Sequence, residues 1–103
     1  MNDSAAVHVL VEASPKEGEM QAVIAGFATS RERLKANRDC IRFDIYEHVG
    51  FPAKLLIMEI WASRAAHQRE VADTMATPEF AAFREKLDED IRFTYLLECK
   101  ETV

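Results

Sequence analysis

The sequence predicts one α+β domain, in which four strands form an antiparallel sheet and helices cover one of its faces. Three observations lead to this fold class. Four short segments alternate apolar and polar residues, and the segments between them repeat apolar residues at helical spacing, in the order β-α-β-β-α-β. This order is the ferredoxin-like arrangement. At 103 residues the chain has the length of one domain, so residues 1–103 are treated as a single unit.

The first strand is predicted over residues 5–13, where Val7, Val9 and Val11 alternate with other side chains. The residues that follow favour a helix start, with Ser14 as N-cap, Pro15 at the first helical position and Glu17 completing a capping box. A helix is therefore predicted from Pro15 to about residue 37. Its buried face would carry Met20, Val23, Ile24, Phe27 and Leu34.

The second and third strands are predicted over residues 40–49 and 54–61. In the second, alternation separates Ile41, Phe43 and Ile45 on one face from Arg42, Asp44 and Tyr46 on the other. From Leu55 to Trp61 the third strand is apolar on both faces, and Glu59 is the only charged residue there. Right-handed crossovers place the first and third strands at the centre of the sheet. A central strand with two apolar faces needs cover on both sides, so we predict a homodimer in which the sheets of two copies pack face to face.

Two consecutive cap signals follow the third strand. Ser63 is expected to cap a helix over residues 64–75. Thr77 and Pro78 then provide a new N-cap and a first-position proline, so the helix is expected to break and restart there. An apolar stripe comes next, made of Phe80, Phe83, Leu87 and Ile91. A fourth strand is predicted over residues 92–101.

Composition excludes several classes of function. The chain carries 18 acidic and 13 basic residues, and the basic ones lie beside acidic ones, so nucleic acid is not an expected partner. Apolar runs fall short of the roughly 20 residues that cross a bilayer, and the N-terminus lacks a secretory signal. No membrane association and a cytoplasmic location are therefore expected. Cys40 and Cys99 both fall in predicted strands and are expected to be reduced and buried.

Cofactor motifs are not recognisable in the sequence. The three histidines show no metal-ligand spacing with one another or with the cysteines. With three glycines, the sequence contains no glycine-rich phosphate loop and no nucleophile elbow. We therefore expect no metal site, and neither a nucleotide-dependent enzyme nor a classical hydrolase.

Three motifs, in this order, resemble the antibiotic biosynthesis monooxygenase (ABM) superfamily: Cys40–Glu47, the strand end Met58–Ser63, and Thr77–Phe83. Family members carry a Gly-Cys-aromatic-x-aromatic strand, a Glu-x-Trp-x-Ser strand end and a Ser/Thr-Pro-x-Phe-x-x-Phe helix. The resemblance spans nearly the whole chain and implies the dimeric α/β barrel. Two positions differ: Asp39 stands where the family has glycine, and Thr74 where many members have histidine. The sequence leaves open whether His67 replaces that histidine.

The resemblance implies an oxygenase that uses neither metal nor flavin and oxidises a small phenolic or quinol-like metabolite with O₂. Such a site needs an apolar pocket, a base for the phenolic proton and donors for the oxyanion. His67 is the candidate base, since its ordinary pKa of about 6.5 leaves it neutral yet basic. Trp61 could stack on the substrate or donate its indole N–H. Arg42 could hold the oxyanion and Tyr46 donate a proton, although an ion pair between Arg42 and Asp44 explains these residues equally well.

The candidate substrate-binding residues are Val71, Met75, Phe80, Phe83 and Tyr95, for which core packing is the alternative interpretation. Two other functions are left open by the sequence. One is a haem-binding or haem-degrading relative, which would need an axial histidine facing the cleft. The other is a non-oxidative isomerase or small-ligand-binding barrel.

Overall fold

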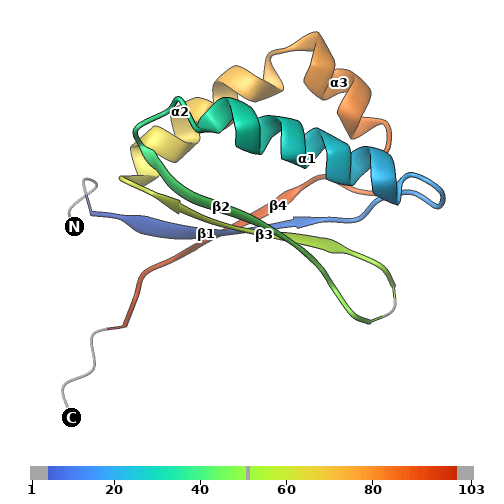
Figure 1. Ribbon diagram of the computed structural model, residues 1–103, viewed down its shortest axis with the longest axis horizontal. Helices are drawn as coiled ribbons and strands as arrows, with labels where there is room; N and C mark the ends of the chain where they lie inside the picture. The colour runs from blue at the N-terminus through green and yellow to red at the C-terminus, as the bar shows by residue number, and fades with distance from the viewer. Residues whose placement is uncertain (1–4, 51, 100–103) are drawn as a thin grey trace.

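The computed structural model describes residues 5–50 and 52–99. These contain β1 (Val7–Ala13), α1 (Met20–Leu34), β2 (Cys40–Glu47), β3 (Leu55–Trp61), α2 (Arg64–Met75), α3 (Pro78–Arg84) and β4 (Arg92–Leu96). The strands form one sheet in the order β2-β3-β1-β4, with every neighbouring pair antiparallel. The three helices lie on one face of this sheet (Figure 1). The predicted fold class, with β1 and β3 at the centre, is confirmed.

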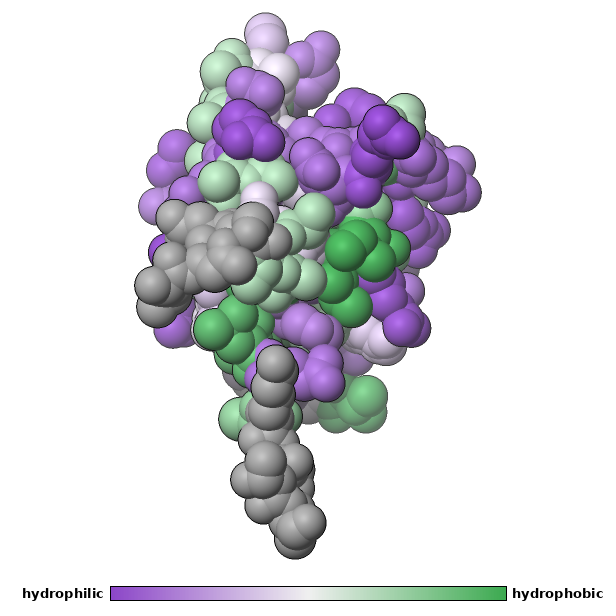
Figure 2. Space-filling view, turned by 90° about the vertical axis from the view of Figure 1, so that its left-hand side faces the viewer, coloured by the Kyte–Doolittle hydropathy of each residue, from purple (hydrophilic) through white to green (hydrophobic). Residues whose placement is uncertain are grey.

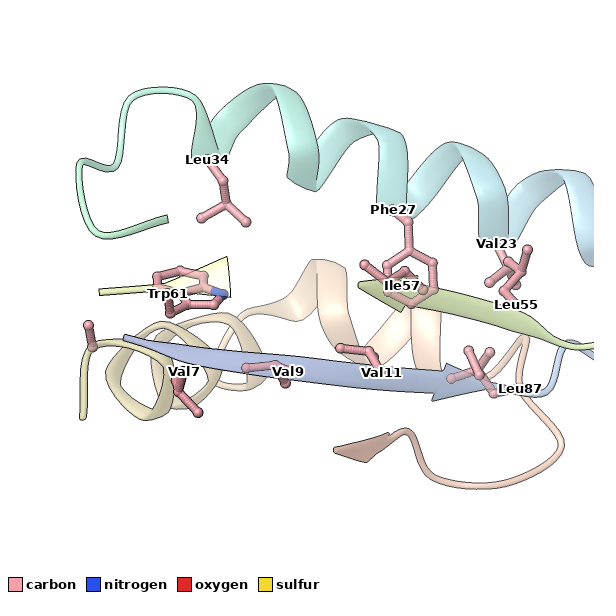
Figure 3. Close-up of a cluster of buried hydrophobic side chains, with 12 residues drawn as sticks. Val7, Val9, Val11, Val23, Phe27, Leu34, Leu55, Ile57, Trp61 and Leu87 are labelled. Atoms are coloured by element: carbon pink, nitrogen blue, oxygen red, sulfur yellow. The ribbon is translucent and has the colours of Figure 1, made fainter. Parts of the chain in front are cut away.

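The main core lies between the sheet and α1. Every second residue of the two central strands is buried on this side, from Val7 to Ala13 in β1 and from Leu55 to Trp61 in β3. Helix α1 points Val23, Phe27 and Leu34 down onto these strands (Figure 3). The period of two in the strands and the three-then-four spacing in the helix therefore meet in one apolar layer.

Helix α1 begins at Met20, and the predicted start at Ser14 and Pro15 is wrong. The Ser14 carbonyl accepts a hydrogen bond from the Asp88 N–H at 2.8 Å, and Pro15 forms an isolated bridge with Leu87. Gly18, with φ of 82°, then turns the chain toward the helix. The capping signal at Ser14 does not start a helix, because the backbone of this segment is instead paired with the segment that precedes β4.

The two cap signals after β3 are confirmed. The Ser63 hydroxyl accepts from the Ala66 N–H at 3.1 Å, and the Thr77 hydroxyl accepts from the Phe80 N–H at 3.2 Å. Pro78 occupies the first turn of α3, which ends at Arg84. The rest of the predicted apolar stripe lies beyond this helix, where Leu87 is buried in the core.

Two predictions about the strands need correction, one at the start of β2 and one at the end of β4. A register shift between Cys40 and Arg42 leaves Ile41 59% exposed, whereas Phe43 and Ile45 pack on the core as predicted. The extra residue reverses the side-chain alternation at that point. Strand β4 ends at Leu96, so Cys99 is exposed rather than buried in a strand. Cys40 is half-buried, and both cysteines are free. Residues 100–101 of the predicted strand lie outside the described residues.

The second face of the sheet carries no helix among the described residues (Figure 1). Its apolar side chains are Leu10, Tyr46, Leu56, Met58, Ile60 and Leu96. In the side view of Figure 2, strongly apolar residues appear as separate spots at mid-height and below, while the upper part, where the helices lie, is mostly polar. Exposed apolar surfaces of this kind often serve as sites of association with another molecule. No helix in the described part of the chain is long and apolar enough to span a membrane.

We predict that Gly18→Ala lowers the free energy of unfolding by about 1 kcal/mol, because a Cβ is disfavoured at a positive φ. No atom lies within 4 Å of the position a Cβ would take, so backbone strain alone is tested. Urea denaturation measures the change. Gly18→Asn serves as the control and should lose less, since asparagine tolerates this conformation. Equal stability of Gly18→Ala and the parent would contradict the assigned turn.

Candidate active site

A cavity of about 660 Å³ opens between the sheet and the three helices. Its wall is mainly apolar and aromatic, formed by Val11, Phe27, Leu34, Phe43, Val71, Met75, Phe80, Phe83, Ile91 and Phe93. The volume suits a small organic molecule. Four of the predicted substrate-binding residues lie in this wall: Val71, Met75, Phe80 and Phe83.

The position of Phe83 depends on Gly26 of α1. A Cβ on Gly26 would lie 2.5 Å from the Phe83 ring, so only glycine lets the ring rest against the helix. Phe83 also meets Phe27 edge-to-face at 5.3 Å between ring centroids. These contacts hold α3 over the cavity while keeping its aromatic side chains in the wall.

Four side chains from three elements form a buried polar cluster, defined as Glu59, Trp61, His67 and Tyr95. Glu59 and Trp61 share a face because they are two residues apart on β3, and the Trp61 indole N–H donates to Glu59 Oε1 at 2.6 Å. His67 Nδ1 and the Tyr95 hydroxyl are 2.8 Å apart. His67 Nε2 lies 3.7 Å from the same Glu59 Oε1. The strand β3, the helix α2 and the strand β4 thus converge at one point.

Aromatic rings enclose His67 on three sides. The rings of Trp61, Phe93 and Tyr95 each meet the imidazole edge-on, with centroids 5.4 Å away. His67 is only 2% exposed. Tyr95 is not part of the cavity wall and instead holds His67 from behind. The structure therefore places Tyr95 beside His67 and not in the wall, and its predicted role in substrate binding stays a prediction.

Burial shifts the pKa values of the cluster in opposite directions. It raises the pKa of Glu59 to about 7, against the opposing hydrogen bond from Trp61, and the Glu70 charge raises it further. Burial lowers the pKa of His67 to about 4, with the Glu70 charge opposing. The pKa of Tyr95 is raised, mainly by burial. At neutral pH His67 is therefore uncharged, whereas Glu59 sits close to its own midpoint and can exchange a proton.

A charged pair borders the cavity at its edge. Arg33 of α1 reaches Glu70 of α2 at 2.8 Å, and the Thr74 hydroxyl donates to Glu70 at 2.7 Å. All three residues line the cavity. Thr74, at the position where many family members have histidine, thus supports a carboxylate that links two helices.

Arg42 and Tyr46 do not reach the cavity. They pair in register with Ile60 and Leu56, whose side chains point to the open face of the sheet. Arg42 binds Asp44 there, which is the ion pair that the sequence offered as the alternative. The structure therefore assembles His67 and Trp61 but leaves Arg42 and Tyr46 on the other side of the sheet.

Sequence reasoning missed Glu59, which is 6% exposed and lines the cavity. A usable signal was present, because Glu59 is the only charged residue in an otherwise apolar strand. A carboxyl in a central strand is costly to bury without a partner or a function. As for metals, the described ranges contain no group of three or more His, Cys, Asp or Glu residues that could hold an ion.

Comparisons with known proteins agree with the fold. The sequence model of the antibiotic biosynthesis monooxygenase family matches residues 6–86. No curated protein sequence matches the chain. Among solved structures, it is similar to Rv0793 from Mycobacterium tuberculosis, with 21% identity, a TM-score of 0.72, and coverage of 96% of this chain and 100% of that chain.

Two further structures are comparable. PA3566 from Pseudomonas aeruginosa has 16% identity and a TM-score of 0.73, with 97% of this chain and 100% of that chain covered. A protein from Caulobacter crescentus CB15 named after the same family has 14% identity and a TM-score of 0.75, with 95% and 93% covered. At these identities the likeness establishes the fold alone.

We predict that Glu59→Gln exposes a pH dependence of stability that the parent hides. The lowered pKa of folded His67 adds stability above pH 6.5 that is lost as pH falls toward 4. The raised pKa of folded Glu59 adds stability below pH 4.5 that is lost as pH rises through 7. These slopes oppose each other in the parent. Without Glu59, the free energy of unfolding should rise by about 2–3 kcal/mol as the pH is raised from 4 to 6.5, between the folded and unfolded pKa values of His67.

Chemical denaturation of both proteins at a fixed concentration, from pH 4 to pH 7, measures these slopes. Parallel curves for the parent and Glu59→Gln would show that the two groups are not buried as described.

Proposed function

This chain belongs to the antibiotic biosynthesis monooxygenase family, whose sequence model matches residues 6–86, and on that premise we propose that it oxidises a small phenolic or quinol-like aromatic metabolite with O₂. The observation that carries the proposal is the cavity. It combines about 660 Å³ and a mainly aromatic and aliphatic wall with a set of buried polar side chains, Glu59, Trp61 and His67. Other polar residues of the lining, among them Arg33 and Glu70, come from the helices. An aromatic ring would be held by the wall while its hydroxyl meets the polar cluster.

The proposed reaction needs no outside reductant. Removal of the phenolic proton leaves an electron-rich anion that can pass an electron to O₂ itself. For a phenol that becomes a quinone, the hydroxyl hydrogen and one ring hydrogen leave with one oxygen atom as water, and the other oxygen atom becomes the new carbonyl. The substrate thus supplies all four electrons. The protein would orient the ring, accept the proton and exclude water.

The alternatives have less support in the geometry. A haem-binding function needs a histidine nitrogen that is open to the cavity. In His67, Nδ1 is bonded to the Tyr95 hydroxyl and Nε2 faces Glu59. A non-oxidative isomerase would use the same cavity without consuming O₂, so oxygen uptake separates that possibility from the proposed reaction.

A homodimer formed through the open face of the sheet is part of the proposal. This face carries half-buried Met58 and Ile60 at its centre and exposed Tyr46 and Leu96 nearer its edges. Pairing two such faces would bury these side chains, with an expected total area above about 2,000 Å². A cytoplasmic location stays a prediction from the sequence.

We predict that the protein, freed of metal and flavin, consumes O₂ with members of a phenol and quinol panel, and that Val71→Trp reduces this rate at least tenfold. Val71 lies in the cavity wall, so an indole there fills the substrate space. The matched control is Ala72→Trp, at the neighbouring, exposed position of α2. An oxygen electrode measures the rates. No uptake across the panel, or equal loss in both variants, would contradict the proposal.

We predict a mass of twice the 11.7 kDa chain by light scattering, and that Met58→Glu shifts it to one chain or lowers the melting temperature. The charge would be buried in the proposed interface. Met58 is the informative position because Ile57, its neighbour, faces the helices and is fully buried in the core. Ala25→Glu, on the exposed side of α1, should change neither property. A Met58→Glu protein with the mass and melting temperature of the parent would refute the interface.

A further inference from the structure

We infer that Glu59 is the residue that accepts the proton of the substrate, and that His67 and Trp61 are positioning residues that hold its carboxyl in place. This inference rests on the proposed function and assigns the acid–base group of the same site. The step breaks the O–H bond of the substrate hydroxyl and forms an O–H bond on Glu59. The electron pair stays on the substrate oxygen, which becomes the oxyanion that reacts with O₂.

The first support is the geometry of the carboxyl. Glu59 lines the cavity from β3, a central strand that is hydrogen-bonded to β1 and β2 on its two sides. Its backbone is therefore fixed. The Trp61 N–H and His67 Nε2 both approach Oε1, at 2.6 and 3.7 Å. Both contacts involve Oε1 and neither involves Oε2. Because Glu59 lines the cavity, we assign Oε1 as the oxygen that anchors the carboxyl and Oε2 as the one that meets a substrate hydroxyl.

The second support is the confinement of His67. A base must present a lone pair to the substrate, and the neighbours of both ring nitrogens of His67 restrict this. Nδ1 is 2.8 Å from the Tyr95 hydroxyl, and Nε2 is directed at Glu59. If the Tyr95 hydroxyl donates to Nδ1, then Nε2 carries the proton and presents it to the Glu59 carboxylate. The imidazole would thereby stabilise the ionised form of Glu59, which is the form that can accept a proton.

The third support is the electrostatic surrounding of Glu59. Burial, together with the nearby Glu70 carboxylate, raises the pKa of Glu59 to about 7, which suits proton transfer at neutral pH. By contrast, burial lowers the pKa of His67 to about 4, so the neutral imidazole is a weak base. The titratable groups that surround the Glu59 carboxyl come from several elements: Cys40 of β2, His67 and Glu70 of α2, and Tyr95 of β4, with Arg33 of α1 paired to Glu70.

The decisive variant is Glu59→Gln, which keeps an oxygen that can accept the Trp61 hydrogen bond but removes the base. We expect the rate of O₂ consumption to fall by at least 100-fold. The defect should shrink progressively with phenols of lower pKa, because these bind already ionised. Glu59→Asp, which retracts the carboxyl by one methylene, should keep an intermediate rate and serves if the amide variant folds poorly. Glu32→Gln, on the outer surface, is the matched control.

His67→Gln tests the positioning role. We expect its rate to stay within about tenfold of the parent, while the midpoint of the pH–rate profile moves, because Glu59 loses a neighbour that favours its ionised form. Abolished turnover in His67→Gln with a nearly normal rate in Glu59→Gln would make His67 the acceptor and overturn the inference. The inference is also overturned if the loss of rate in Glu59→Gln does not depend on the pKa of the phenol.

A binding experiment separates this inference from the proposed function. 4-Nitrophenol is too electron-poor to react with O₂ readily, and its absorbance reports whether it is ionised. We expect the parent to bind a larger phenolate fraction than Glu59→Gln at the same pH. Equal phenolate fractions in the two proteins would overturn the assignment of Glu59 alone. Absence of O₂ uptake, with this difference intact, would overturn the oxygenase proposal and leave Glu59 as the proton acceptor of another reaction.

Discussion

The burial of one carboxyl group between sheet and helices is the constraint on which the rest of the site depends. Glu59 is placed there by the strand period, since its neighbours on the same face, Ile57 and Trp61, are core residues. A carboxylate in such surroundings is unfavourable unless it is partnered or neutral. The indole N–H of Trp61 partners it directly. This hydrogen bond does not offset the whole cost of burial, so the pKa of Glu59 is raised to about 7. At that value the carboxyl can gain or lose a proton near neutral pH.

The cavity exists because the helical layer does not close completely over this carboxyl. The break at Thr77 and Pro78 lets α3 leave the direction of α2, and Phe83 then rests against Gly26 rather than filling the space beneath. An unfilled apolar space of this size reduces packing and therefore stability. The contacts of His67 with three aromatic rings and the ion pair of Arg33 with Glu70 tie the surrounding elements together. One side of the cavity is thus formed by the hydrogen-bonded sheet, and the other side is formed by separate helices.

The two faces of the sheet have different tasks. One face carries the core and the polar cluster, and the other carries an apolar surface with Arg42 and Tyr46 at one edge. Neighbouring residues of one strand therefore lie on opposite sides of the sheet, so only some of them can reach the cavity. Any association through the open face would leave the cavity accessible, because the helices lie on the opposite side (Figure 1).

The sequence by itself determined the order of strands and helices, the central place of β1 and β3, and the caps at Ser63 and Thr77. The strands, helices and caps depend on neighbouring residues, through a period of two, a period of 3.6 or a cap within one turn. The central place of β1 and β3 follows from the order of these elements, because crossovers are right-handed. It also indicated four wall residues and three members of the polar cluster, His67, Trp61 and Tyr95, the last of them as a substrate-binding residue.

Only the tertiary structure decided the start of α1, where Ser14 pairs with Asp88 far along the chain, and the outward turn of Ile41 at the bulge. It alone brought Tyr95 to His67, 28 positions away, and revealed Glu59 beside them. Local patterns cannot report these contacts, because each depends on how strands and helices pack after they form. The pKa values follow from the same packing, since burial and neighbouring charges exist only in the folded chain.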